Sequence, residues 1–266
     1  MKIWTVANQK GGVGKTTTVA ALSGILSQKG FRVLMIDCDP HASLTAYFGF
    51  DSEHLPTTLF NWFSETPTST QQAFDSIIKL DEPNISLMPA ALSLATLDKR
   101  FSGREGMGLV ITRVLKMLNN DYDYVLIDCP PVLGVLLINA LAACEQLIIP
   151  VQTEFLAIKG LERMMNTLNM VIKAQHHTIG YTIVPTMFDR RTKASIQALR
   201  NMRDEFGGHL WSKWIPVDTK FRDASRNNKT PSLAYPDTHG VEAYQKLADT
   251  MLALTSSDDD VTSVAS

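Results

Sequence analysis

Residues 8–18 of the chain read NQKGGVGKTTT. The letters GKT at 14–16 match the end of the phosphate-binding pattern G-x-x-x-x-G-K-[ST], but Gln9 stands where that pattern has its first glycine. A second lysine, Lys10, comes next and is followed by two glycines at 11–12. Glycines let the backbone turn so that successive N–H groups point at phosphate oxygens, and a following helix presents its N-terminus to the same anion. The stretch predicts a phosphate-binding loop with an altered opening and a lysine that the loop itself does not require.

The segments around this loop predict parallel βαβ units. An apolar strand over 3–8 precedes the loop, and a helix from about 16 to 29 follows it, with Gly30 placed to end that helix. Further β-branched runs predict strands over 32–39, 84–90, 124–130, 146–152 and 179–188. Helical spacing of apolar residues predicts helices over 107–119, 134–144, 157–175, 193–206 and 240–254. The expected fold is α/β, a single doubly wound and mostly parallel β-sheet flanked by helices.

Composition sets the limits of this interpretation. The chain has 266 residues, of which 45% are hydrophobic and 20% charged, with a formal charge of −2. We expect one domain over 1–254, followed by an acidic and polar tail over 255–266 that is disordered. The segment 51–81, rich in Thr, Ser and Pro, is expected to be irregular and to form an insertion over the sheet edge. No apolar run approaches the roughly 20 residues of a membrane helix, and the N-terminus does not read as a signal peptide, so the expected location is cytoplasmic.

Polar residues in the loop and at strand ends carry the expected chemistry. Lys15 would reach the β- and γ-phosphates of a nucleotide, and the Thr16 hydroxyl would hold Mg²⁺. Asp128 ends the apolar run YVLID, where a metal-supporting carboxylate should stand, although an aspartate there can also cap a helix or form a turn. Asp37 and Asp39 follow the second strand and can serve Mg²⁺ or orient an attacking water, while a structural hydrogen-bonding role is equally open for Asp37.

Positive charge is concentrated between residues 189 and 231. This stretch contains ten basic and five acidic residues, whereas the whole chain is slightly acidic. Such asymmetry predicts a basic face that suits a polyanionic partner. Charges scattered over a solvated helix face account for the composition equally well.

Three motifs together resemble the deviant Walker A, or ParA/MinD, family of P-loop ATPases. They are KGGVGKTT (10–17), VLMIDCDP (33–40) and VLIDCPP (125–131), in the order and at spacings similar to that family's. Later segments such as IIPVQTEFLAIKGL (148–161) and THGVEAYQKLADTML (238–252) extend the likeness over nearly the whole chain. The resemblance implies ATP and Mg²⁺ as cofactors, slow ATP hydrolysis stimulated by a protein partner, and formation of a homodimer on ATP binding.

The resemblance also implies roles for individual residues. Lys10 would cross the dimer interface to the partner's phosphates, Lys15 would bind phosphate, and Asp39 would position the hydrolytic water. Thr16, Asp37 and Asp128 would hold the metal. The nucleotide-binding residues implied in this way are Gly11, Gly12, Val13, Gly14, Lys15, Thr16, Thr17, Thr186, Met187, Pro216, Val217 and Asp218, the last five lining the adenine pocket.

Charge distinguishes among the tasks of this family. Members of MinD type end in a basic amphipathic helix that binds membrane, whereas this chain ends with three aspartates at 258–260, so membrane attachment is disfavoured. Members of ParA type bind DNA without sequence preference when dimeric. The residues expected to contact DNA phosphates here are Arg190, Arg191, Lys193, Lys220, Arg222 and Arg226, with Arg191 as the first choice.

The stretches MKIWTVANQKGGVGKTTT and DPHASLTAYFGF look like ParC, the ParA-like group that positions chemotaxis arrays at the cell pole. The expected function is therefore a positioning ATPase with an adaptor or activator protein and a cargo, associated with the nucleoid or the pole. Two alternatives stay open, namely a plasmid- or chromosome-partitioning ParA protein and an ATP-dependent amidase or synthetase of the same fold. Enzymes of the last kind generally lack a lysine at the position of Lys10. His41 either borders the pocket or is a turn residue after Pro40.

Overall fold

The computed structural model describes residues 1–100, 106–155, 157–175 and 178–263. Within these residues, seven strands form one sheet in the order β3-β4-β2-β5-β1-β6-β7. The strands are β1 (Lys2–Val6), β2 (Val33–Asp37), β3 (Ile78–Lys79), β4 (Ile85–Met88), β5 (Tyr124–Asp128), β6 (Gln146–Gln152) and β7 (Gly180–Thr186). All neighbouring strands are parallel except β3 and β4, which are antiparallel. The predicted α/β sheet is confirmed.

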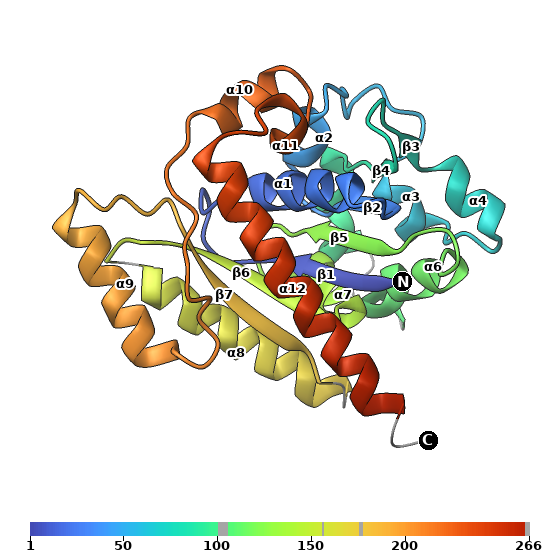
Figure 1. Ribbon diagram of the computed structural model, residues 1–266. Helices are drawn as coiled ribbons and strands as arrows, with labels where there is room; N and C mark the ends of the chain where they lie inside the picture. The colour runs from blue at the N-terminus through green and yellow to red at the C-terminus, as the bar shows by residue number, and fades with distance from the viewer. Residues whose placement is uncertain (101–105, 156, 176–177, 264–266) are drawn as a thin grey trace.

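Helices cover both faces of the sheet (Figure 1). Alternate side chains of β1 enter different cores, as strand geometry requires: Trp4 packs with Leu22 of α1 (Lys15–Gln28) and Leu247 of α12 (His239–Ser263), whereas Ile3 faces the core of the other helices. That second core includes side chains of α6 (Val110–Met117), α7 (Val135–Ala143) and α8 (Ala157–Gln175). Because β1 lies between β5 and β6, the loop after it leaves the sheet where the strand order reverses, which is where open α/β sheets bind ligands.

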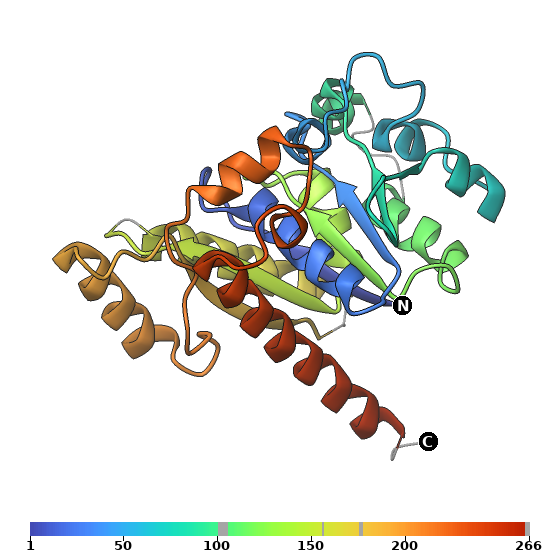
Figure 2. The ribbon, with the colours of Figure 1, turned by 45° about the horizontal axis from the view of Figure 1, so that its top comes forward.

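The remaining elements are shorter or lie at the periphery. Those before β5 are α2 (Ser43–Tyr47), α3 (Leu59–Ser64), α4 (Thr70–Asp75), η1 (Leu92–Thr96), α5 (Leu97–Arg100) and η2 (Met107–Leu109). Those after β7 are α9 (Lys193–Phe206), α10 (Lys220–Arg226) and α11 (Pro231–Ala234). Figure 2 shows α10 and α11 on the same side of the sheet as α1 and α12, while α9 stands at the edge formed by β7. Of the described helices, none combines the length and the apolar character needed to cross a bilayer.

The segment 51–81 lies at the sheet edge, as predicted, because β3 is the last strand of the sheet. It is more regular than its composition suggested, since it forms α3 and α4 as well as β3. The physical reason is burial of two aromatic side chains, Trp62 and Phe63, which anchor α3 in the core.

Helix α12 continues to Ser263, and the disorder expected over 255–266 stays a prediction. This helix is anchored by Tyr244, Leu247 and Met251, which are fully buried beside α1. Extending an existing helix costs little compared with starting one, so polar residues can continue it beyond the packed face. The predicted boundary at 254 therefore falls inside α12, and 264–266 lie outside the described residues.

Candidate functional site

The loop between β1 and α1 has the backbone of a phosphate cradle. Gly12 and Gly14 have φ values of 73° and 92°, a left-handed conformation that glycine adopts without a steric penalty. Gly14 caps α1, and its carbonyl accepts the first helical hydrogen bond, from the Thr18 N–H at 2.9 Å. Apart from the residues next to each glycine in the chain, no described residue has a heavy atom within 4 Å of the position that a Cβ on Gly11 or Gly12 would take. The loop therefore leaves open space at the N-terminus of a helix, where an anion is stabilised.

Strands β6 and β7 hold this loop in place. Asn8 donates its side-chain N–H to the Pro150 carbonyl at 2.8 Å, and Thr186 donates its hydroxyl to the Val13 carbonyl at 2.9 Å. The next residue, Met187, has φ 53°, and its methyl carbon lies 4.0 Å from the position of a Cβ on Gly14. Two residues expected in the adenine pocket, Thr186 and Met187, are thus brought against the loop from a strand far away in sequence.

Lys15, Thr16 and Asp128 meet inside the loop. The buried Lys15 ammonium donates to the Lys10 carbonyl at 3.1 Å, and the Thr16 hydroxyl donates to Asp128 Oδ2 at 2.6 Å. Asp128 Oδ1 is buried and accepts no hydrogen bond from the described residues. Burial, and next the negative charge of Asp37, raises the pKa of Asp128 well above its usual value. A carboxylate oxygen left without a donor beside a threonine hydroxyl fits a divalent cation with oxygen ligands.

Asp37 differs from Asp128, although the two residues are paired in register across β2 and β5. Asp37 Oδ1 accepts the Asp39 N–H at 3.1 Å, and Oδ2 accepts both the N–H and the hydroxyl of Thr45 at 2.8 Å. Burial raises the pKa of Asp37 to about 6 despite these bonds. The structure thus shows the hydrogen-bonding role left open for Asp37, and its role as a Mg²⁺ ligand stays a prediction.

Asp39 begins the turn after β2 and has a partner two residues later. Its Oδ1 accepts hydrogen bonds from the His41 N–H at 2.9 Å and from the His41 ring Nδ1 at 2.8 Å. His41 is strongly exposed, as a turn residue would be, but its ring also contacts the carboxylate expected to handle water.

Lys10 lies on the outside of the loop and forms an ion pair with Glu154, just after β6. The sequence reasoning did not identify Glu154. The rule that selected Asp37 and Asp128, an acid at the carboxyl end of a strand beside the loop, would have found it. Three large apolar side chains are exposed just after two strands of the sheet. Phe155 is 84% and Val132 68% exposed, and Leu133 is also exposed. They follow β5 and β6, the strands on either side of β1.

The segment predicted to complete the adenine pocket runs beside β7. Phe188 donates its N–H to the Ile215 carbonyl at 3.1 Å, and Pro216 pairs with Phe188. Val217 is exposed. Asp218 instead links the first turns of α10 and α12, since its oxygens accept the Lys220 N–H at 2.9 Å and the Gly240 N–H at 3.1 Å.

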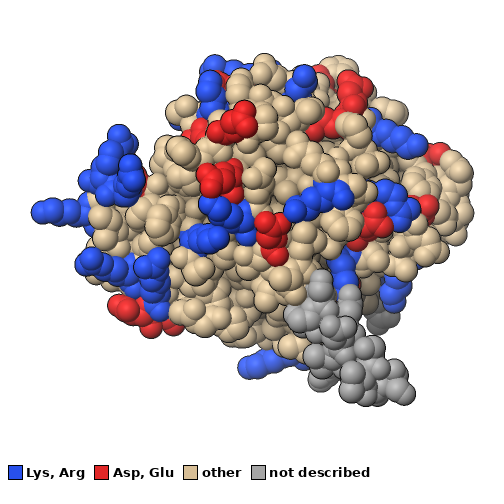
Figure 3. Space-filling model, viewed as in Figure 1, with Lys and Arg blue, Asp and Glu red and all other residues tan. Residues whose placement is uncertain are grey.

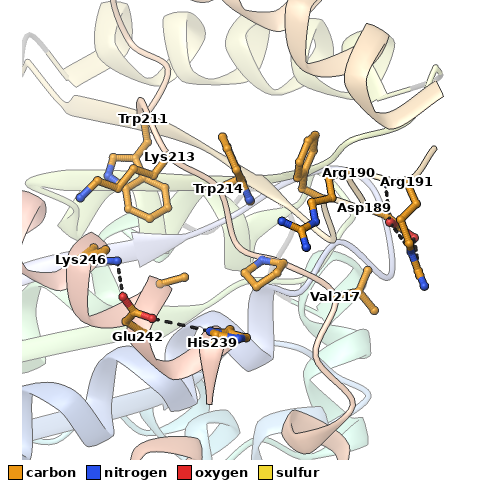
Figure 4. Close-up of a pocket in the computed structure, with 13 residues that line it drawn as sticks. Asp189, Arg190, Arg191, Trp211, Lys213, Trp214, Val217, His239, Glu242 and Lys246 are labelled. Carbon is orange, nitrogen blue, oxygen red and sulfur yellow. Dashed lines mark hydrogen bonds and ion pairs between the residues drawn. The ribbon is translucent and has the colours of Figure 1, made fainter. Parts of the chain in front are cut away.

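A hollow of about 640 Å³ opens between residues 211–217, the loop before α9, and α12 (Figure 4). We call it the basic hollow, and its lining includes Arg190, Lys213, Trp214, His239 and Lys246. Arg190 points into it beside Trp214 (Figure 4), whose ring contacts Phe188 at 4.7 Å between centroids. Neither Arg190 nor Lys213 forms an ion pair with a described residue.

The residues expected to contact DNA fall into two groups. Arg190, Arg191 and Lys193 lie before and at the start of α9, where Figure 3 shows Lys and Arg gathered on the surface. Arg191 makes a two-pronged ion pair with Asp189, with N–O distances of 2.9 and 2.8 Å, and this holds the pKa of Asp189 at about 2. The second group is on α10 and consists of Lys220, Arg222 and Arg226. Lys220 is paired with Asp223 at 3.1 Å and lies 4.9 Å from the centre of the Tyr235 ring.

Comparison with known proteins agrees with this geometry. The family model described as AAA domain matches residues 1–180. The chain is 32% identical to the sporulation initiation inhibitor protein Soj of Bacillus subtilis over 95% of this chain and 98% of that protein. It is 33% identical to the chromosome partitioning protein ParA of Caulobacter vibrioides over 93% and 92% of the two chains. Its fold matches cobyrinic acid a,c-diamide synthase of Mycobacterium smegmatis, solved with a bound ATP analogue and magnesium, with a TM-score of 0.82 and 32% identity over 95% and 94% of the chains. This chain belongs to the AAA domain family and, within it, to the ParA/MinD-like P-loop ATPases.

Proposed function

We propose that the chain is an ATP-dependent dimerising switch of ParA type. Two ATP-bound copies would pair through the loops at the carboxyl edge of the sheet, bind DNA without sequence preference, and separate after slow, partner-stimulated hydrolysis of ATP to ADP and phosphate. The cargo we propose is a chemotaxis array held at the cell pole through an adaptor protein, because the sequences around the phosphate loop and around His41 resemble ParC. Enrichment at the nucleoid or the pole is part of the same proposal.

The observation that carries the proposal is the different surroundings of two lysines in one loop. Lys15 is buried and folds back over its own loop, which is the arrangement that a phosphate loop needs. Lys10 lies on the outer side, and among the described residues its ammonium group is paired only with Glu154. The exposed apolar side chains of Val132 and Phe155 follow the strands on either side of β1, and exposed apolar side chains at one edge favour a docking surface there. A second copy docked there would bring its own Lys10 toward the phosphates.

Within one subunit, we propose the following roles for the predicted phosphate, metal and base contacts. The loop N–H groups and Lys15 would bind the β- and γ-phosphates, and Thr16 and Asp128 would hold Mg²⁺, which neutralises phosphate charge when bound. Asp39 would orient the attacking water. The base would lie against Met187 and Val217, two exposed apolar side chains, of which Met187 directly follows the Thr186 contact to the loop.

Non-specific DNA binding is supported by unpaired positive charge. Arg190 and Lys213 have no acidic partner among the described residues, so their charges are available to phosphates without breaking an ion pair. A DNA phosphate at Arg191 would have to compete with Asp189 for the guanidinium group. The free charge of Arg190 supports it over Arg191 as the stronger phosphate contact, and we propose Lys213 as a further contact beside the residues expected from the sequence.

Substitution of Lys10 by Ala tests the switch. We expect the variant to bind ATP like the original chain but to lose the dimer that forms with ATP and Mg²⁺, measured by light scattering. The matched control is Lys29→Ala, which removes another lysine in an ion pair, with Asp249, at the far end of α1. Unchanged ATP-dependent dimerisation of the Lys10 variant would contradict the proposal.

A second candidate is an ATP-dependent amide-forming enzyme, favoured by the likeness to cobyrinic acid a,c-diamide synthase. An enzyme of this class would activate a carboxyl substrate with ATP. It would not take ammonia from glutamine through a cysteine of this chain, because Cys38, Cys129 and Cys144 are buried and burial raises the pKa of each thiol. In this class the Lys10 variant keeps its oligomeric state. A partitioning ParA protein would follow the same cycle as the switch with DNA as its cargo.

A further inference from the structure

We propose that His41 is a positioning residue that holds the carboxylate of Asp39 in the orientation presented to the nucleotide. The inference rests on the proposed ATP hydrolysis and deepens it, because it concerns the orientation of the carboxylate that would handle the attacking water. It assigns a function to a histidine that the sequence left as either a pocket-edge residue or a turn residue.

The two oxygens of Asp39 have unequal surroundings. Oδ1 accepts two hydrogen bonds from His41, one from the backbone N–H at 2.9 Å and one from ring Nδ1 at 2.8 Å. Oδ2 accepts none from the residues that the structure describes. One oxygen is therefore held and the other is free for a water molecule.

The backbone under Asp39 is held independently of the His41 ring. Its N–H donates to the buried Asp37 at 3.1 Å, and its carbonyl accepts the Ala42 N–H at 2.8 Å. What these bonds leave undetermined is rotation of the carboxylate about its last torsion, which is broad and roughly two-fold for aspartate. The backbone N–H of His41 restricts that rotation through one hydrogen bond to Oδ1, and the His41 ring adds a second one to the same oxygen. Since catalytic groups act efficiently only when they are held in the reactive geometry, we expect the ring to affect the hydrolytic step and not ATP binding.

The chain contains a matched pair outside the nucleotide loops. His54 Nδ1 lies 2.7 Å from Asp51 Oδ2, both side chains are exposed, and Asp51 Oδ1 accepts the Glu53 N–H at 3.1 Å. The chemistry resembles that of His41 and Asp39, but the pair lies in the segment that leads to the sheet edge. Substitution of His54 therefore controls for loss of a histidine–aspartate contact as such.

The experiment measures phosphate release by the full chain over a range of ATP concentrations with Mg²⁺. We expect His41→Ala to lower kcat about tenfold while KM for ATP stays within about twofold, because a hydrogen bond to a charged group is lost only from the hydrolytic step. His41→Asn should restore kcat to within about threefold, since the asparagine amide N–H can replace ring Nδ1–H as donor. His54→Ala should match the original chain.

Three outcomes would overturn the inference: a wild-type kcat for His41→Ala, an Asn variant no better than the Ala variant, or an effect on KM with kcat unchanged. The last result would place His41 in nucleotide binding. A failure of the proposed function gives a different pattern, because the unsubstituted chain would then release no more phosphate than Lys15→Ala.

Discussion

The carboxyl edge of the sheet and the basic hollow hold their charges in opposite ways. At the edge, Lys15, Asp37 and Asp128 are buried, and the Thr16 hydroxyl on Asp128 joins segments far apart in the chain. Around the hollow, the ion pairs are exposed and local, such as Arg191 with Asp189 and Lys246 with Glu242. Buried, cross-linked charges can bind one ligand in one pose, whereas exposed charges suit any polyanion. We therefore expect single substitutions at the edge to have large effects on ATP binding or stability, and substitutions at the hollow to have graded effects on DNA binding.

The largest effect is expected from Lys15→Ala. Removing the buried ammonium deletes charge-assisted hydrogen bonds to the phosphates, and we expect ATP affinity to fall by about a hundredfold or more. Equilibrium dialysis with labelled ATP measures the loss, and thermal melting of the variant shows whether the fold is kept. Tight ATP binding by a folded Lys15 variant would mean that ATP affinity at this edge does not depend on its buried charges.

Thr45→Val tests the buried network without touching a phosphate ligand. The Thr45 hydroxyl donates to Asp37 and accepts the Ala90 N–H at 2.9 Å, so valine leaves two buried groups with fewer partners. We expect the free energy of unfolding to fall by about 2 kcal/mol, measured by urea denaturation. The control Thr96→Val removes an exposed hydroxyl that donates to the Ser93 carbonyl and should change stability by less than about 0.5 kcal/mol. Equal losses in the two variants would erase the distinction between buried and exposed polar groups.

DNA retention tests the hollow. We expect Arg190→Glu to weaken ATP-dependent binding to random duplex DNA about tenfold at about 50 mM salt, and Asp189→Asn to strengthen it by freeing Arg191. Binding of both variants should fall steeply toward about 200 mM salt, while ATP affinity changes little, because exposed charges are screened more than buried ones. A filter-binding titration measures both trends. Arg191→Glu supplies the comparison that decides between the two arginines. Equal DNA retention by all forms would mean that the hollow does not bind DNA.

The smallest effect is expected from Glu154→Gln. Its ion pair with Lys10 is partly exposed, and such pairs contribute about 0–1 kcal/mol. If Lys10 must leave Glu154 to reach a second copy, the variant should form the ATP dimer more tightly, by at most about fivefold. Analytical ultracentrifugation measures this shift. Weaker dimerisation would show that Glu154 contributes to the interface itself.

Much of the fold could be predicted from the sequence because its signals are local. The strand–loop–helix order around residues 8–18 and the placing of Gly30 depend on neighbouring residues alone, and the structure confirms them. The end of the last helix could not be predicted in this way. The apolar pattern indicates a helix only to about residue 254, whereas α12 continues to Ser263 from the side chains that pack beside α1.

The chemical groups available to this protein follow from its residues, since glycines, lysines and strand-end aspartates in the phosphate loop and its neighbours have few other uses together. The partners of these groups follow from the tertiary fold. It left Asp128 with a free oxygen while using both oxygens of Asp37, and it joined Lys10 to Glu154 and His41 to Asp39. The physical reason is that hydrogen-bond satisfaction and burial depend on side chains from other segments, which the order of residues along the chain does not place.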